Sequence, residues 1–234
     1  MRFDSHGIYN PINYDLEELI SRAESGKYLP KPLESNTASA FASWVFYLCH
    51  IRHKVNDDFE EITFQKAKKR EFEISESLKN LDGVRAFSSK GDWKLIYQDP
   101  IDTNTSSIFF IAPNLSIKNV PMNCRPDVVL FNESSANLLI IERKVAITSN
   151  AFVPNTCYPN ILAQLWCYSQ IDFEDARWPK SSFITLAAEL WTHTRSESEL
   201  DGGRICWTWQ KNARDFKYIE ILFSIYKGHF ESLT

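Results

Sequence analysis

The stretch RPDVVLFNESSANLLIIERKV, residues 125–145, contains two apolar runs with a polar segment between them. The runs occupy residues 128–131 and 138–141, and residues 132–137 separate them. Short apolar runs on either side of a polar turn predict the two strands of a β-hairpin. The second run is apolar at successive positions, which predicts a strand that is covered on both faces.

The predicted hairpin brings two carboxylates face to face. A symmetric turn pairs Val128 with Ile141, and the same register places Asp127 opposite Glu142. Opposed carboxylates on neighbouring strands repel each other, so this arrangement suits a divalent cation between them. Lys144 projects from the same face as Glu142, about 6–7 Å further along the strand. Two oxygen ligands and a nearby ammonium can activate water against a phosphodiester.

A simpler interpretation of the same residues stays open. Taken one residue at a time, Asp127 starts a strand and residues 142–144 form an exposed, charged strand end. Charged groups at the end of a buried strand are costly unless they are paired or bound to a metal. The combination of all three residues therefore favours a site.

The remaining sequence predicts one α/β domain with a mixed sheet. Helices are expected at Asp15–Ala23, Ser39–His53, Asp57–Leu81 and Asn160–Ile171. Strands are expected at Trp93–Tyr97, Ser107–Ala112, Asp127–Phe131, Asn137–Val145 and Ser181–Trp191, and the sequences RICWTWQ (204–210) and YIEILFSIY (218–226) supply one or two more. We expect residues 1–56 to form a helical lead-in packed on residues 57–234, the whole being one compact unit.

Composition limits the class of protein. The chain of 234 residues is 44% hydrophobic with only 7 glycines, which favours a globular core over Gly-rich architectures. Its net charge of −4 argues against binding nucleic acid by bulk positive charge. The five cysteines are widely spaced, the N-terminus is polar, and no apolar run approaches the roughly 20 residues of a membrane span. We therefore expect a soluble, cytoplasmic protein without a membrane partner.

The hairpin and the helix after it resemble the PD-(D/E)xK nuclease superfamily. Pro126-Asp127 and Glu142-Arg143-Lys144 match its Pro-Asp and Glu-x-Lys elements. The sequence QLWCY, from Gln164 to Tyr168, resembles the Gln-x-x-x-Tyr helix motif of the RecB-like branch. These two side chains are four residues apart and project from one helix face. The resemblance covers about residues 64–191.

This resemblance also implies an acid on the helix before the sheet. The candidate is Glu71, which lies on the apolar face of the predicted helix 57–81. Glu73 and Glu76 lie on the same helix and remain alternatives, with a solvated helix face as their simpler interpretation.

The resemblance implies a restriction-endonuclease-like core and a nuclease that uses Mg²⁺, with Mn²⁺ as a substitute. Its implied metal ligands are Asp127, Glu142, the backbone carbonyl of Arg143 and Glu71. Lys144 would orient or activate the attacking water. Gln164 and Tyr168 would position Lys144 or the phosphate by hydrogen bonding.

The partner implied is nucleic acid, DNA rather than RNA, with a homodimer or a partner protein also expected. Two alternatives stay open. The first is a catalytically silent, nuclease-like binding module in a phage, mobile-element or defence complex, and the second is a ribonuclease that uses the same site. Because the net charge is −4, non-specific binding to nucleic acid should be modest.

Overall fold

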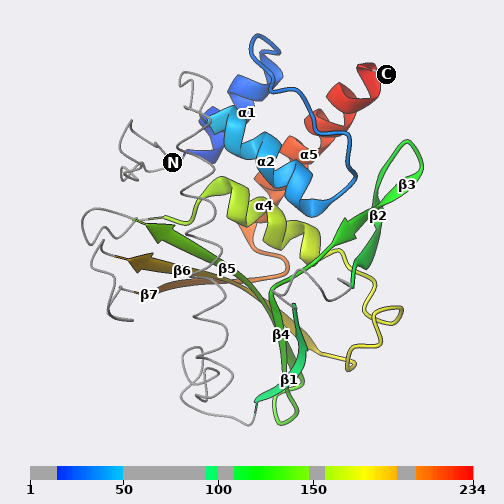
Figure 1. Cartoon of the computed structure of the whole chain (residues 1–234), viewed down its shortest axis with the longest axis vertical. Coiled ribbons are helices and arrows are strands. Elements are labelled where there is room, and N and C mark those ends of the chain that lie inside the picture. The colour runs from blue at the N-terminus through cyan, green and yellow to red at the C-terminus, as the bar shows by residue number, and fades with distance from the viewer. Residues whose placement is uncertain (1–14, 50–92, 100–107, 148–155, 194–203, 234) are drawn as a thin grey trace.

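The computed structural model describes residues 15–49, 93–99, 108–147, 156–193 and 204–233 (Figure 1). The helices are α1 (Leu16–Glu24), α2 (Ala38–Cys49), α4 (Pro159–Tyr168) and α5 (Arg214–Ser232). The strands are β1 (Trp93–Gln98), β2 (Phe110–Ile117), β3 (Val120–Cys124), β4 (Val128–Asn132), β5 (Asn137–Ile147), β6 (Phe183–His193) and β7 (Arg204–Gln210). The predicted helix 57–81, with Glu71, Glu73 and Glu76, lies outside the described residues.

A mixed sheet forms the centre of the described structure. Its five strands run in the order β1-β4-β5-β6-β7. Strands β5 and β6 are parallel, whereas the other neighbouring pairs are antiparallel. The hairpin β4–β5 has the predicted register, with Val128 opposite Ile141. The predicted α/β class is confirmed, and the architecture is consistent with a restriction-endonuclease-like core.

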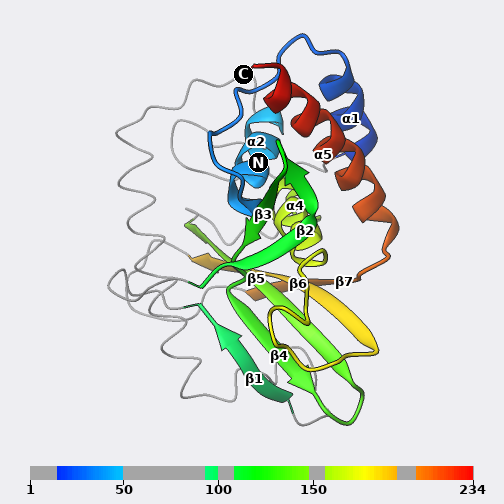
Figure 2. The ribbon, with the colours of Figure 1, turned by 90° about the vertical axis from the view of Figure 1, so that its right-hand side faces the viewer.

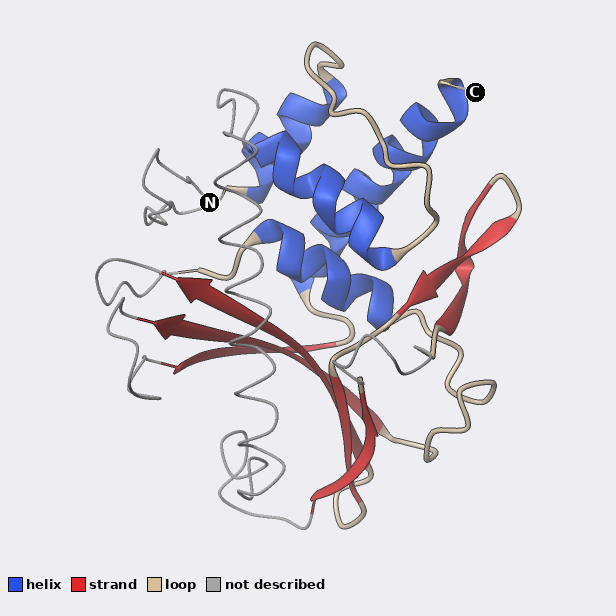
Figure 3. Cartoon of the chain, viewed as in Figure 1, coloured by secondary structure: helices blue, strands red, loops and turns tan. Residues whose placement is uncertain are grey.

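The described helices all lie on one side of this sheet (Figures 2 and 3). Helix α4 joins the parallel strands β5 and β6 and packs on both of them, as a crossover helix does. Helices α2 and α5 pack on α4, and α1 packs on α5. Buried aromatic rings join these helices, with Phe41 5.3 Å from Phe223 and 5.2 Å from Tyr226 between ring centroids. This layer holds one face of α4 against the sheet.

Local signals explain where the helices begin. The Asp15 carboxylate accepts hydrogen bonds from the first backbone N–H groups of α1, and Thr37 caps α2 by accepting from the N–H of Ala40 at 3.1 Å. Pro159 begins α4, a position where its missing N–H costs nothing. All three helices therefore start within a few residues of the predicted boundaries.

Strand β5 is buried on both faces, as its apolar run predicts. Leu138 and Ile140 belong to the large core beneath the helices, whereas Leu139 and Ile141 belong to a second cluster on the opposite face. Side chains alternate between the two faces of a strand. Glu142, two residues beyond Ile140, therefore points toward the helices, and the side chain of the next residue points away from them.

The interpretation of residues 218–226 as a strand is wrong, because they lie within helix α5. The buried residues of α5 recur at helical spacing and are Phe216, Ile219, Leu222, Phe223 and Tyr226. Aromatic and β-branched residues favour strands locally, but packing of this apolar face against the other helices determines the outcome. The strand predicted at residues 204–210 is confirmed as β7.

The ribbon formed by β2 and β3 departs from the prediction. The expected strand Ser107–Ala112 overlaps only the start of β2, and Ser107 lies outside the described residues. Strand β3 has no predicted counterpart. The turn between them places Lys118 and Asn119 at φ values of 50° and 63°. Turns of this kind are usually signalled by glycine or asparagine at both positions, and Lys118 does not provide that signal.

Candidate functional site

Asp127 and Glu142 lie next to each other at the end of the β4–β5 hairpin that is remote from its turn. Asp127 immediately precedes β4, and Glu142 follows Ile141, the last partner of β4 in the ladder. The Asp127 carboxylate accepts a hydrogen bond of 2.5 Å from the backbone N–H of Arg143. The structure therefore brings together the two carboxylates that the sequence places opposite each other.

This pair of acids is electrostatically costly. Burial and repulsion from Glu142 raise the pKa of Asp127 from 3.8 to about 7, although Lys144 and the backbone N–H of Arg143 act in the opposite direction. Two buried carboxylates that share a site cannot both ionise without a compensating positive charge. The site accordingly favours either a proton or a cation on Asp127.

Lys144 supplies part of that positive charge. Its ammonium contacts Oε1 of Glu142. The Glu142 side chain is 1% exposed, whereas that of Lys144 is 37% exposed. The lysine therefore reaches from the buried carboxylate to the solvent, where a substrate can meet it.

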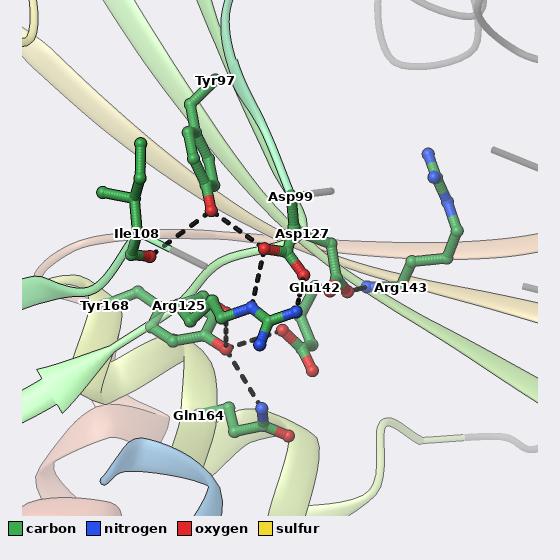
Figure 4. Close-up of polar contacts among 9 residues, drawn as sticks. All are labelled: Tyr97, Asp99, Ile108, Arg125, Asp127, Glu142, Arg143, Gln164 and Tyr168. Atoms are coloured by element: carbon green, nitrogen blue, oxygen red, sulfur yellow. Dashed lines mark hydrogen bonds and ion pairs between the residues drawn. The ribbon is translucent and has the colours of Figure 1, made fainter. Parts of the chain in front are cut away.

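Helix α4 contributes the second part of the predicted site (Figure 4). The Tyr168 hydroxyl lies 2.8 Å from Oε2 of Glu142 and 3.0 Å from the backbone oxygen of Arg125. Gln164 Nε2 donates to the same hydroxyl at 3.0 Å. A hydroxyl has one hydrogen and donates to one acceptor at a time. Tyr168 therefore contacts the Glu142 carboxylate itself, and Gln164 is linked to that carboxylate through the Tyr168 hydroxyl.

The Tyr168 hydroxyl is in the protonated form that a hydrogen-bond donor requires. Burial and the neighbouring carboxylates of Glu142 and Asp127 raise the pKa of Tyr168 well above its ordinary value. The hydroxyl therefore stays protonated at neutral pH.

The Arg143 side chain lies on the opposite face of the sheet and points away from Glu142 (Figure 4). Its Nε donates to Oε2 of Glu189 on β6 at 2.6 Å, and both side chains are buried. Only the backbone of Arg143 borders the two carboxylates. No sequence feature points to Glu189, because its position beside Arg143 depends on the β5–β6 register.

A polar cluster that no sequence pattern indicates lies beside the site and consists of Tyr97, Asp99 and Arg125 (Figure 4). Arg125 Nε donates to Asp99 Oδ1 at 2.6 Å, and its Nη2 donates to Oδ2. The Tyr97 hydroxyl donates to Oδ1 at 3.0 Å. Hydrogen bonding to Asp99 raises the pKa of Arg125, so its guanidinium is charged. Asp99 directly follows β1, and its pairing with Arg125 has no signal in the sequence.

Among the described residues, no group of three or more His, Cys, Asp or Glu side chains is arranged to hold a metal ion. The predicted ligand Glu71 lies outside these residues, so Asp127 and Glu142 are the predicted carboxylate ligands that the structure describes. No helix within the described ranges is long and apolar enough to cross a membrane.

Comparisons with known proteins add little to this picture. No protein-family model matches the chain, and no curated protein matches it. The crystal structure of SSO0001 is similar at a TM-score of 0.37 and 9% sequence identity, over 90% of this chain and 84% of that one. A similarity this weak supports neither a relationship nor a function.

Proposed function

We propose that the chain is a Mg²⁺-dependent nuclease that hydrolyses phosphodiester bonds of nucleic acid, with DNA preferred over RNA. The observation that carries this proposal is the buried pair Asp127 and Glu142, with the Lys144 ammonium on Glu142. The resemblance of these residues to the PD-(D/E)xK motif supplies the reaction class and the substrate class.

The donor set around this pair fits Mg²⁺. Two carboxylates are hard oxygen ligands, and Mg²⁺ and Mn²⁺ prefer such ligands. The repulsion that raises the pKa of Asp127 is relieved when a cation binds between the carboxylates. Glu71 remains a proposed further ligand.

The backbone carbonyl of Arg143 is a proposed third ligand. The N–H of Arg143 points toward β4, where it donates to Asp127. In a β-ladder the N–H and C=O of one residue point to the same neighbouring strand, so the carbonyl points toward Asp127 as well. The hairpin register, extended past Val128, places Pro126 opposite Arg143. Proline has no N–H to donate to that carbonyl.

The residues of the chain have two roles in this proposal, which are to orient the Glu142 carboxylate and to stabilise charge. When bound, Mg²⁺ supplies charge stabilisation at the phosphate and lowers the pKa of a bound water. The Tyr168 hydroxyl lies at one oxygen of Glu142 while Lys144 contacts the other, so the carboxylate is held in one orientation. The partly exposed ammonium of Lys144 orients the attacking water and stabilises negative charge on the phosphate.

Cleavage of labelled DNA in Mg²⁺ by purified protein tests the proposal. We expect the Asp127→Ala and Lys144→Ala variants to lose at least about 100-fold in rate, the size of a lost acid–base contribution. Lys94→Gln is the matched control, because Lys94 pairs with Glu133 at the exposed turn end of the hairpin. A Lys144→Ala protein that cuts as fast as the parent would overturn the assignment.

Parallel reactions with RNA decide the preferred substrate. A parent protein that cuts neither polymer, and binds no Mn²⁺ through Glu142 by calorimetry, would instead be a nuclease-like binding module.

A further inference from the structure

Arg125 is built into the same network as the two carboxylates. It directly precedes Pro126-Asp127, and its backbone oxygen lies 3.0 Å from the Tyr168 hydroxyl. That hydroxyl also contacts Glu142 at 2.8 Å. The backbone at Arg125 is therefore held at a defined position relative to the candidate metal ligands (Figure 4).

The Arg125 side chain is held as firmly as its backbone. Two of its nitrogens donate to the two oxygens of Asp99, which is the fork geometry of a strong arginine–carboxylate pair. Asp99 is itself fixed, because its side chain accepts from the Tyr97 hydroxyl and its backbone N–H donates to the carbonyl of Asp127 at 2.8 Å. The guanidinium is thus oriented before any ligand arrives.

Most of the donor capacity of Arg125 is left over. A guanidinium carries five N–H donors, and the pairing with Asp99 uses one on Nε and one on Nη2. Within the part of the chain that the structure describes, Asp99 is the only side-chain partner of Arg125. The Arg125 side chain is 36% exposed and that of Asp99 only 11%. Three donors therefore remain on a partly exposed side chain whose charge interacts with Asp127.

If Arg125 served only to link the end of β1 to the start of β4, its two hydrogen bonds to Asp99 would be sufficient. A charged, partly exposed fork that is already oriented is well suited to bind an oxyanion, because little side-chain entropy is lost on binding. The oxyanion that reaches this site in a nuclease is a backbone phosphate. Contacts of this kind fix the register of nucleic acid without reading its bases.

We propose that Arg125 binds a backbone phosphate of the nucleic acid next to the bond that is cut, and that Asp99, held by Tyr97, is the positioning residue that orients its guanidinium. This inference rests on the proposed function, and it extends the site from the carboxylates to the end of β1.

The salt dependence of DNA binding tests it. The measurement is fluorescence anisotropy of a labelled 20-base-pair DNA in Mg²⁺, with every protein in the Lys144→Ala background so that the DNA stays intact. Each phosphate contact on duplex DNA contributes about 0.9 to the slope of log affinity against log salt concentration. We expect Arg125→Gln to reduce that slope by about 0.9 and to weaken binding about 10-fold, the size of a lost charged hydrogen bond.

Two further variants separate this role from charge loss and misfolding. Lys94→Gln removes the same charge from an exposed ion pair and should leave the slope unchanged. Arg125→Lys keeps the charge but loses the fork, so affinity should fall while the slope stays. If Arg125→Gln fails to fold, Arg125→Lys decides, and unchanged affinity in that variant would overturn the inference.

The outcomes distinguish this inference from the proposed function. If the parent cuts DNA and Arg125→Gln retains both the salt dependence and the affinity of DNA binding, this inference is wrong while the proposed function stands. If the parent cuts nothing and the Lys144→Ala protein does not bind DNA, both fail together.

Discussion

The hydroxyl of Tyr168, on helix α4, lies 2.8 Å from the carboxylate of Glu142, on strand β5. The two residues are 26 positions apart in the chain. This contact joins the two halves of the sequence motif, because it ties the Gln-x-x-x-Tyr helix to the Glu-x-Lys strand. The buried carboxylate is thereby oriented by the helix as well as by its own strand.

Removing this hydroxyl should impair the site without unfolding the chain. Tyr168→Phe keeps the ring but leaves Glu142 without one partner, which should cost about 1–3 kcal/mol in the free energy of unfolding. We expect cleavage to fall about 10- to 100-fold, as when an outer-shell partner of a metal ligand is lost. Urea denaturation and DNA cleavage measure the two effects.

Tyr226→Phe is the matched control for that experiment. Tyr226 is also a buried tyrosine, and its hydroxyl has no hydrogen-bond partner among the described residues. Its removal should leave cleavage unchanged and should not lower the free energy of unfolding. A Tyr168→Phe protein that behaves like Tyr226→Phe would contradict the role assigned to the Glu142 contact.

The raised pKa of Asp127 predicts how the stability of the metal-free chain depends on pH. The folded pKa is about 7 against an ordinary value of 3.8, so the folded chain binds the extra proton between these values. The free energy of unfolding should therefore fall as pH rises through this window. Asp127→Asn should abolish this fall and be more stable than the parent at pH 8 by a few kcal/mol, since one pKa unit corresponds to about 1.4 kcal/mol.

Urea denaturation in EDTA at several pH values between 4 and 8 measures this difference. Glu133→Gln, at an exposed ion pair, is the control and should follow the parent. Equal stability of Asp127→Asn and the parent at pH 8 would argue against the mutual repulsion of Asp127 and Glu142.

Metal binding should reverse that loss of stability. A ligand that binds only the folded chain stabilises it, by about 2.7 kcal/mol at a concentration 100 times its Kd. We expect Mn²⁺ or Mg²⁺ to raise the melting temperature of the parent and EDTA to return it to the metal-free value. Glu142→Gln should lose this response, whereas Glu133→Gln should retain it. An equal shift in both variants would locate the metal elsewhere.

The ion pair between Arg143 and Glu189 should contribute strongly to stability. Its two side chains are 7% and 0% exposed. Removing one partner of a buried pair leaves an uncompensated charge and typically costs about 3–5 kcal/mol. We expect a loss of this size for Glu189→Ala by urea denaturation.

The exposed pair of Glu18 and Arg22 on α1 provides the comparison. Exposed ion pairs contribute less than about 1 kcal/mol, so Glu18→Ala should change the free energy of unfolding only slightly. Similar losses in the free energy of unfolding for the two variants would mean that burial does not make the pair on β5 and β6 more stabilising than an exposed pair.

Much of the fold was predictable where the signal is local. The register of β4 and β5 follows from two short apolar runs and the turn between them, because a slip of one residue would turn every side chain to the wrong face. The start of α1 follows from its capping residue Asp15. By contrast, the aromatic and β-branched residues of α5 suggest a strand, and only the packing of Phe216, Ile219 and Tyr226 against other helices makes them helical.

The meeting of Asp127, Glu142 and Lys144 at one end of a hairpin can be predicted from local sequence alone, because the spacing along two adjacent strands sets which residues meet. The contacts that hold these side chains in place depend instead on the packing of distant elements. The contacts of Tyr168 with Glu142 and of Arg125 with Asp99 each span 26 residues, and that of Arg143 with Glu189 spans 46. Such contacts depend on how α4, β1 and β6 pack beside the hairpin, and no local pattern encodes that packing.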